Sequence, residues 1–98
     1  LSMKDIDLFE IHEAFAAQVL ANISAWASGW KEQGIGQVDF AKLNVNGGSI
    51  AIGHPFAATG ARIIFNLAAE LKRRNLKRGL ISICAAGAMA GAMIIERD

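Results

Sequence analysis

The sequence predicts an α/β fold with a mixed β-sheet and flanking helices. Apolar residues recur at helical spacing in two separate segments, short apolar runs of strand length precede and follow these segments, and glycines separate the units. The length of 98 residues and the hydrophobic content of 53% suit one small core. We therefore expect one domain, or part of one.

The first half of the chain predicts a strand, a helix and a surface connection. Residues 6–11 form a short apolar run typical of a strand. A helix is expected from about Glu13 to Ser28, because apolar residues recur there at helical spacing: Phe15, Val19, Leu20, Ile23 and Trp26. Residues 29–39 contain Gly34 and Gly36 among polar residues, which indicates a surface connection.

The second half predicts a glycine loop, a helix and two strands. Pro55 stands where a helix can begin, since its missing N–H is harmless in the first turn. This helix should run to about Arg74 on one apolar face, made of Ile63, Ile64, Leu67, Ala68 and Leu71. Residues 79–84 and 92–96 then predict an antiparallel pair of strands, joined by a reversal of small residues.

Charge and cysteine content exclude several classes of protein. The net charge of +1 gives no field that favours nucleic acid, and the basic residues near the end of the second helix complement the helix dipole. The uncharged run 79–95 reads better as two buried strands than as a transmembrane segment. A single cysteine cannot form an internal disulfide, which favours a reducing compartment such as the cytoplasm.

Three side chains are candidates for chemistry. His12 and Cys84 lie at the carboxyl ends of predicted strands, and His54 precedes a helix. Ligands of open α/β sheets bind outside the carboxyl ends of strands, so these side chains can share one crevice. Gly53 and Pro55 shape the turn that presents His54. On residue chemistry alone, two structural roles remain open: His54 as no more than a cap of a helix or turn, and Cys84 as a buried and inert cysteine.

Three other motifs fail on specific residues. Residues 48–54 nearly match the phosphate-binding loop GxxxxGK, but His54 replaces its lysine. His12-Glu13 begins like the zinc motif HExxH, but Ala16 replaces the second histidine. GxGxxG is absent after a strand. We therefore expect no nucleotide, no metal and no resident cofactor.

The motifs HEAFAAQ at 12–18, NVNGGSIAIGHPFAATGAR at 44–62 and CAAG at 84–87 together resemble the thiolases. The forms HEAF and CAAG are most similar to the 3-ketoacyl-CoA thiolases of fatty-acid oxidation, of the trifunctional-enzyme β-subunit type. Other thiolases usually have asparagine where His12 stands. The resemblance implies a thiolase-like fold in which residues 1–98 are a partial C-terminal domain. It also implies that the N-terminal half, with the nucleophilic cysteine, is absent.

The resemblance implies an acetyl-CoA C-acyltransferase, with coenzyme A as co-substrate. By family analogy, His54 activates the nucleophile and helps to hold the thioester oxygen, and Cys84 is the second, acid/base cysteine. His12 would lie beside the first oxyanion site. The backbone N–H of Ala86 would stabilise the tetrahedral oxyanion of the acyl-enzyme.

The resemblance also implies the surroundings of this site. Gly53, Phe15 and Phe56 are expected at the substrate, where the two aromatic rings would line an acyl or pantetheine channel. The implied partners are acyl-CoA and CoA, the N-terminal thiolase half, further copies in a homo-oligomer, and a hydratase/dehydrogenase subunit. The implied compartment is the cytoplasm, or the mitochondrion in a eukaryote.

Two alternatives to an active thiolase stay open. The first is a catalytically inactive remnant of the fold that serves as a binding or oligomerisation module, and the isolated chain is expected to be inactive in either case. The second is a condensing enzyme related to ketoacyl synthases, which Cys84 disfavours because those enzymes typically have histidine there.

The turn after Cys84 departs from the family pattern. Ala88 and Ala90 stand where thiolases commonly have glycine. If either position requires positive φ, alanine costs about 1 kcal/mol relative to glycine.

Overall fold

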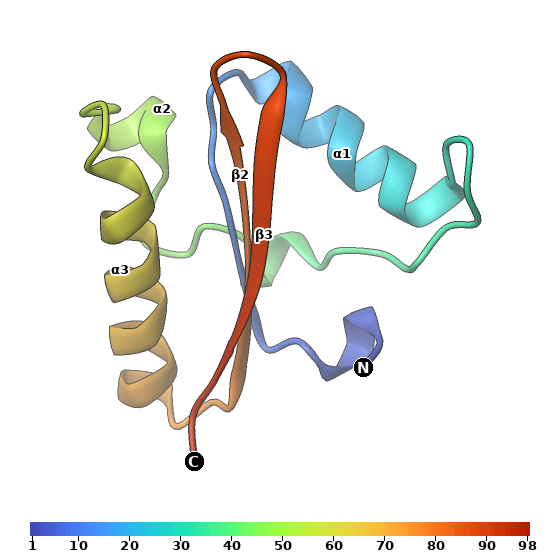
Figure 1. The fold of residues 1–98 in the computed structure, drawn as a ribbon. Coiled ribbons are helices and arrows are strands. Elements are labelled where there is room, and N and C mark those ends of the chain that lie inside the picture. Colours follow the sequence, from blue (N-terminus) through green and yellow to red (C-terminus); the bar gives the residue numbers. More distant parts are fainter.

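The computed structural model describes all residues, 1–98, and contains a mixed three-stranded sheet in the order β1-β2-β3 (Figure 1). Strand β1 (Leu8–Ile11) pairs parallel with β2 (Arg78–Ala85), and β2 pairs antiparallel with β3 (Met89–Glu96). The α/β class, the mixed sheet and the final antiparallel pair are therefore confirmed. The run 79–95 lies in the two strands of this pair and the turn between them. The expectation that both strands are buried is wrong, however, because β3 is exposed along almost its whole length.

Two long helices cover the two faces of the sheet (Figure 1). Helix α1 (Ala16–Ser28) packs on one face and α3 (Thr59–Arg74) on the other. The expected start of α1 at Glu13 is wrong by three residues. The Glu13 carboxylate instead accepts hydrogen bonds from the Ile50 backbone N–H and from Asn44 Nδ2. These bonds keep residues 12–15 out of the helix.

The expected start of α3 at Pro55 is also wrong. Ala57 has φ +63°, in the left-handed region, and a residue in that conformation cannot continue a right-handed helix. The Pro55 carbonyl accepts the backbone N–H groups of Ala58 and Thr59, which closes a turn before the helix begins. The other end agrees with expectation, because α3 ends at Arg74 before Asn75, which caps it at φ +56°.

Three short elements were not predicted. Helix α2 (Ser49–Ile52) follows the glycine pair, and two 3₁₀ turns lie at Met3–Asp5 and Phe40–Lys42. Each is only three or four residues long, too short for an apolar periodicity to be read. Residues 29–39 form the expected connection, although Val38 is buried in the core.

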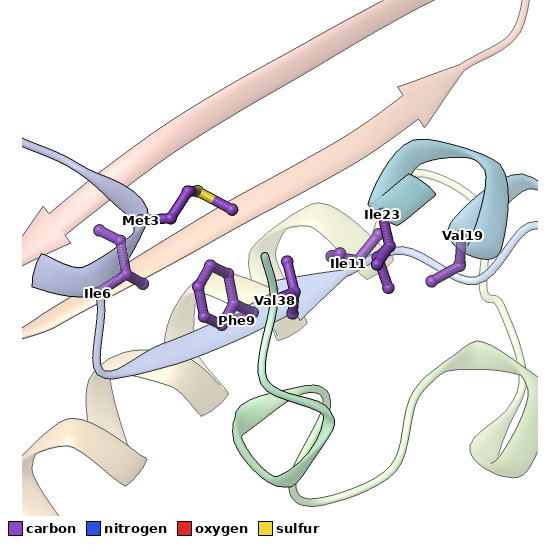
Figure 2. Close-up of a cluster of buried hydrophobic side chains, with 7 residues drawn as sticks. All are labelled: Met3, Ile6, Phe9, Ile11, Val19, Ile23 and Val38. Carbon is purple, nitrogen blue, oxygen red and sulfur yellow. The ribbon is translucent and has the colours of Figure 1, made fainter. Parts of the chain in front are cut away.

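The sheet divides the apolar core into two clusters. The cluster on the α1 face, drawn in Figure 2, consists of Met3, Ile6, Phe9, Ile11, Val19, Ile23 and Val38. The cluster on the α3 face consists of Leu8, Ile63, Leu67, Leu71 and Ile81. Of the five residues expected on the apolar face of this helix, Ile64 and Ala68 are exposed. The buried stripe of α3 is thus narrower than predicted.

Four of the basic residues at the end of α3 and just after it are paired with carboxylates. Glu70 accepts hydrogen bonds from Arg73 and Arg74, and Glu96 forms ion pairs with Lys77 and Arg78. Their charges are engaged within the chain. None of the helices has both the length and the apolar character that a membrane crossing requires.

Candidate functional site

The candidate site lies at the carboxyl ends of β1 and β2, beside α2 and the β2–β3 turn (Figure 1). A mostly apolar hollow of about 940 Å³ opens there. Six of the seven side chains and backbone groups expected at the site line it: His12, Phe15, His54, Phe56, Cys84 and Ala86. The structure thus brings residues from three distant segments to one hollow, as the strand-end argument predicted.

His12 is anchored on both its backbone and its ring. Its backbone N–H donates to the Ser82 carbonyl of β2 at 2.8 Å, which extends the parallel pairing by one residue. Its Nδ1 lies 3.0 Å from Ser49 Oγ, and Arg62 also donates to that oxygen at 3.2 Å. Burial lowers the pKa of His12, and His54 and Arg62 lower it further. The ring, in a residue only 5% exposed, is therefore neutral at pH 7.

His54 lies against His12, with the two ring centroids 4.4 Å apart. Its Nδ1 lies 2.7 Å from Thr59 Oγ1, at the first residue of α3. Phe56 packs beside the same ring at 4.9 Å between centroids. The turn therefore holds the imidazole between an aromatic ring, a hydroxyl and the second histidine.

Gly53, the seventh expected residue, does not line the hollow. Its φ of +90° requires glycine, and a Cβ there would meet open space. Its carbonyl accepts a hydrogen bond from Arg62 at 2.9 Å. Gly53 thus shapes the turn before His54, but it lies outside the hollow at which the resemblance placed it.

Cys84 is half-buried on β2, opposite Ala90 of β3. The turn that follows has positive φ at Gly87 (+78°) and Ala88 (+57°). Positive φ is therefore adopted at Ala88 and not at Ala90. Ala88 and Ala57 both line the hollow and both lie in the left-handed region, where a residue with a Cβ costs about 1 kcal/mol.

Sequence reasoning missed the polar residues that support the site. Ser49, Thr59 and Arg62 contact the two histidines or their turn. Asn44 pairs with the last residue of β1, accepting from the Ile11 N–H at 2.8 Å and donating to the Ile11 carbonyl at 2.9 Å. All four residues stand in the segment 44–62 that resembles thiolases. The sequence signal that could have identified these residues is their polar character within an otherwise apolar stretch.

No group of three or more metal-binding side chains gathers in the structure. The hollow contains two histidines and one thiol, and the neighbouring carboxylate of Glu13 is engaged by Asn44 and Ile50. What this set can do is move a proton and donate hydrogen bonds to an oxygen.

The family model described as "Thiolase, C-terminal domain" matches residues 1–97. The chain belongs to the thiolase family. This thiolase domain is 48% identical to the 3-ketoacyl-CoA thiolase of Shewanella loihica, over 98% of the chain and 24% of that protein. It is 50% identical to the 3-ketoacyl-CoA thiolase of Yersinia enterocolitica, with the same coverage of both.

Solved structures agree with these sequence matches. Human mitochondrial 3-ketoacyl-CoA thiolase superimposes with a TM-score of 0.85 at 42% identity, over 100% of this chain and 22% of that one. The acetyl-CoA acetyltransferase of Bacillus anthracis superimposes with a TM-score of 0.83 at 44% identity, over 97% and 22%. The chain therefore has the thiolase fold and spans about a quarter of the length of its curated relatives.

Proposed function

We propose that the chain is the C-terminal part of a 3-ketoacyl-CoA thiolase, an acyltransferase that cleaves 3-ketoacyl-CoA with CoA in fatty-acid β-oxidation. The supporting observation is that His12, His54 and Cys84 line one apolar hollow. They do so in a chain about half identical, along its whole length, to proteins named 3-ketoacyl-CoA thiolase.

The first half of the reaction uses a cysteine that the N-terminal half must supply, because Cys84 is the one cysteine here. His54 takes the proton of that thiol, and the thiolate attacks the 3-keto carbon. His12 donates a hydrogen bond to the oxyanion. The bond between C2 and C3 breaks, and the Cys84 thiol protonates the acetyl-CoA carbanion, which leaves as acetyl-CoA.

The second half returns the enzyme to its starting state. The Cys84 thiolate takes the proton of incoming CoA, and the CoA thiolate attacks the thioester of the acyl-enzyme. The backbone N–H of Ala86 stabilises the tetrahedral oxyanion. When the tetrahedral intermediate collapses, it releases an acyl-CoA that is two carbons shorter than the substrate. The nucleophilic cysteine is set free in the same step.

The two exposed aromatic rings fit a channel for the substrate. Phe15 is 74% exposed and Phe56 is 85% exposed, and both border the hollow. A contiguous apolar surface of this kind marks a site of interaction. The two rings therefore suit contact with the pantetheine arm, the acyl chain or the N-terminal half. A solved relative was crystallised in complex with CoA. We assign CoA and acyl-CoA as ligands on these grounds.

The wider setting is proposed by analogy. We assign the N-terminal thiolase half as a partner, together with further copies in a homo-oligomer and a hydratase/dehydrogenase subunit. The proposed compartment is the bacterial cytoplasm, or the mitochondrion if the source is eukaryotic.

The test is an assay of CoA-dependent 3-ketoacyl-CoA cleavage by the chain alone and mixed with an N-terminal thiolase half. We expect activity only in the mixture, and a loss of about a hundredfold or more with Cys84→Ala. Ser82→Ala is the matched control, since Ser82 lies on the same strand but does not line the hollow. Full activity of the Cys84→Ala mixture would refute the acid/base role. Inactivity of every mixture would favour a remnant that serves in binding or oligomerisation.

A further inference from the structure

Each histidine of the site has one ring nitrogen committed to a hydroxyl group. His12 Nδ1 lies 3.0 Å from Ser49 Oγ, and His54 Nδ1 lies 2.7 Å from Thr59 Oγ1. The two contacts look equivalent, but the hydroxyl groups have different second partners. A hydroxyl has one proton to donate, so its second partner decides which way the bond to the imidazole runs.

At Thr59 the proton is used elsewhere. Thr59 Oγ1 lies 3.2 Å from the Pro55 carbonyl oxygen, which can only accept. If the hydroxyl proton pointed at His54, two oxygen lone pairs would face each other at this distance. The hydroxyl therefore donates to Pro55, and His54 donates its Nδ1–H to Thr59. The Nε2 of a neutral His54 then bears a free lone pair.

At Ser49 the hydroxyl proton is available for a hydrogen bond to His12. Arg62 donates to Ser49 Oγ at 3.2 Å and has no acceptor to offer. His12 Nδ1 is therefore the acceptor available to the Ser49 hydroxyl. Both residues are buried, at 8% and 5% exposure, and the opposite direction would leave a buried hydroxyl proton unpaired. A protonated His12 would also lie next to Arg62. His12 consequently carries its proton on Nε2.

We propose that Thr59 and the Ser49–Arg62 pair are positioning residues that hold the two histidines in opposite tautomers. His54 is the Nδ1–H form, whose Nε2 accepts a proton, and His12 is the Nε2–H form, whose Nε2 donates a hydrogen bond. Use of these tautomers in catalysis rests on the proposed function: a base for the nucleophilic thiol and a neutral donor for the oxyanion. The tautomers themselves do not depend on it.

The same arrangement explains why two histidines with ring centroids only 4.4 Å apart can have different roles. A base needs an empty lone pair, and an oxyanion donor needs an N–H. If both rings had the same tautomer, the site would hold two bases or two donors. The roles of the two histidines differ because the hydroxyl groups have different second partners, the Pro55 carbonyl for Thr59 and the Arg62 guanidinium for Ser49.

The experiment reads the tautomers directly. The chain contains two histidines, so ¹⁵N-histidine labelling gives only four ring nitrogens to assign by long-range ¹H–¹⁵N correlation spectra. At pH 8 we expect one ring protonated at Nδ1 and the other at Nε2. Two rings with the same tautomer would overturn the proposal, and this measurement needs no variant and no substrate.

Variants then test the positioning residues. Thr59→Val should return His54 to a mixture of tautomers and leave His12 unchanged, whereas Thr59→Ser should restore the Nδ1–H form. Ser49→Ala should change His12 alone. In the thiolase assay we expect Thr59→Val to lower kcat about ten- to a hundredfold with little change in KM, and Thr59→Ser to recover most of it. A Thr59→Val protein with an unchanged His54 tautomer would refute the assignment.

The two proposals can fail separately. Opposite tautomers in a protein without thiolase activity would support the positioning assignment and count against the proposed function. Thiolase activity in a protein whose two histidines share one tautomer would support the proposed function and count against the positioning assignment.

Discussion

At the scale of single residues, Glu10 is the most unusual group outside the histidines. It lies on β1, facing α3, and is only 6% exposed. It borders a polar cavity of about 10 Å³, lined also by Arg62 and Asn66, with room for about one water molecule. Burial raises the pKa of Glu10 to about 7; the charge of Glu13 adds to this and that of Arg62 opposes it.

This raised pKa predicts that Glu10→Gln changes the pH dependence of stability. Folded Glu10 keeps its proton between its ordinary pKa of 4.5 and about 7, whereas unfolded Glu10 has lost it. The stability contributed by Glu10 is therefore fully present below pH 4.5 and is lost as the pH rises through 7. The full rise in the pKa of Glu10 corresponds to a change of about 3 kcal/mol in the free energy of unfolding. Because the adjacent cavity and Arg62 screen the charge, we expect a change of about 2 kcal/mol.

Urea unfolding at several pH values, followed by tryptophan fluorescence, measures the difference between the two proteins. Glu10→Gln and the natural chain should be about equally stable near pH 4, and the variant should be more stable at pH 8. The other carboxylates titrate in both proteins and cancel in the difference. A difference that stays constant from pH 4 to pH 8 would mean that Glu10 is ionised like an ordinary surface carboxylate.

At the scale of elements, the packing of α3 on β2 depends on one glycine. Leu67 is among the most deeply buried side chains, and a Cβ at Gly79 would approach its side-chain atoms to 2.6 Å. Gly91, on the neighbouring strand β3, offers a contrast, since a Cβ there would meet Ile83 at an ordinary 3.8 Å. Neither glycine has positive φ, so steric contact alone separates the two positions.

This contrast predicts different outcomes for the same substitution. Gly79→Ala should push α3 away from the sheet and lower the free energy of unfolding by about 2 kcal/mol. Gly91→Ala should be neutral or raise it by about 0.5 kcal/mol, because alanine loses less backbone entropy than glycine in a strand. Urea titration of both variants checks the pair. Equal effects of the two substitutions would show that the helix yields freely at Leu67.

The elements also show how far the sequence predicts this fold. Long elements with clear periodicity were correctly predicted, as were the strand ends that bring His12 and Cys84 together. The helix starts were wrong because tertiary contacts decide them. The carboxylate of Glu13 is drawn to Ile50, 37 residues away, and the positive φ of Ala57 cannot be read from an alanine. The support of the histidines by Ser49 and Thr59 likewise exists only after folding.

At the scale of the whole molecule, the chain exposes more large apolar side chains than it buries. Fourteen are exposed, against twelve in the buried core. Strand β3 adds to this surface, because it pairs only with β2 and leaves one edge open, with Met89, Met93 and Ile94 exposed along it. An open, apolar strand edge is a template for pairing with another chain.

We therefore expect the isolated chain to associate with a second copy through β3 as its concentration rises. Ile94→Lys should reduce this association without lowering stability, because Ile94 is 46% exposed and lysine on an edge strand opposes pairing. Ile95→Lys is the matched comparison on the same strand. Ile95 packs against the cluster on the α3 face, so a charge there should unfold the domain instead.

Sedimentation velocity across a concentration series, with urea unfolding of each protein, separates these effects. If the natural chain stayed monomeric at every concentration, the open edge would not be a docking edge. If Ile94→Lys associated as strongly as the natural chain, another exposed surface would be responsible, such as the aromatic rings beside the hollow. Reduced association in Ile94→Lys with unchanged stability would identify β3 as the edge through which two copies of the chain associate.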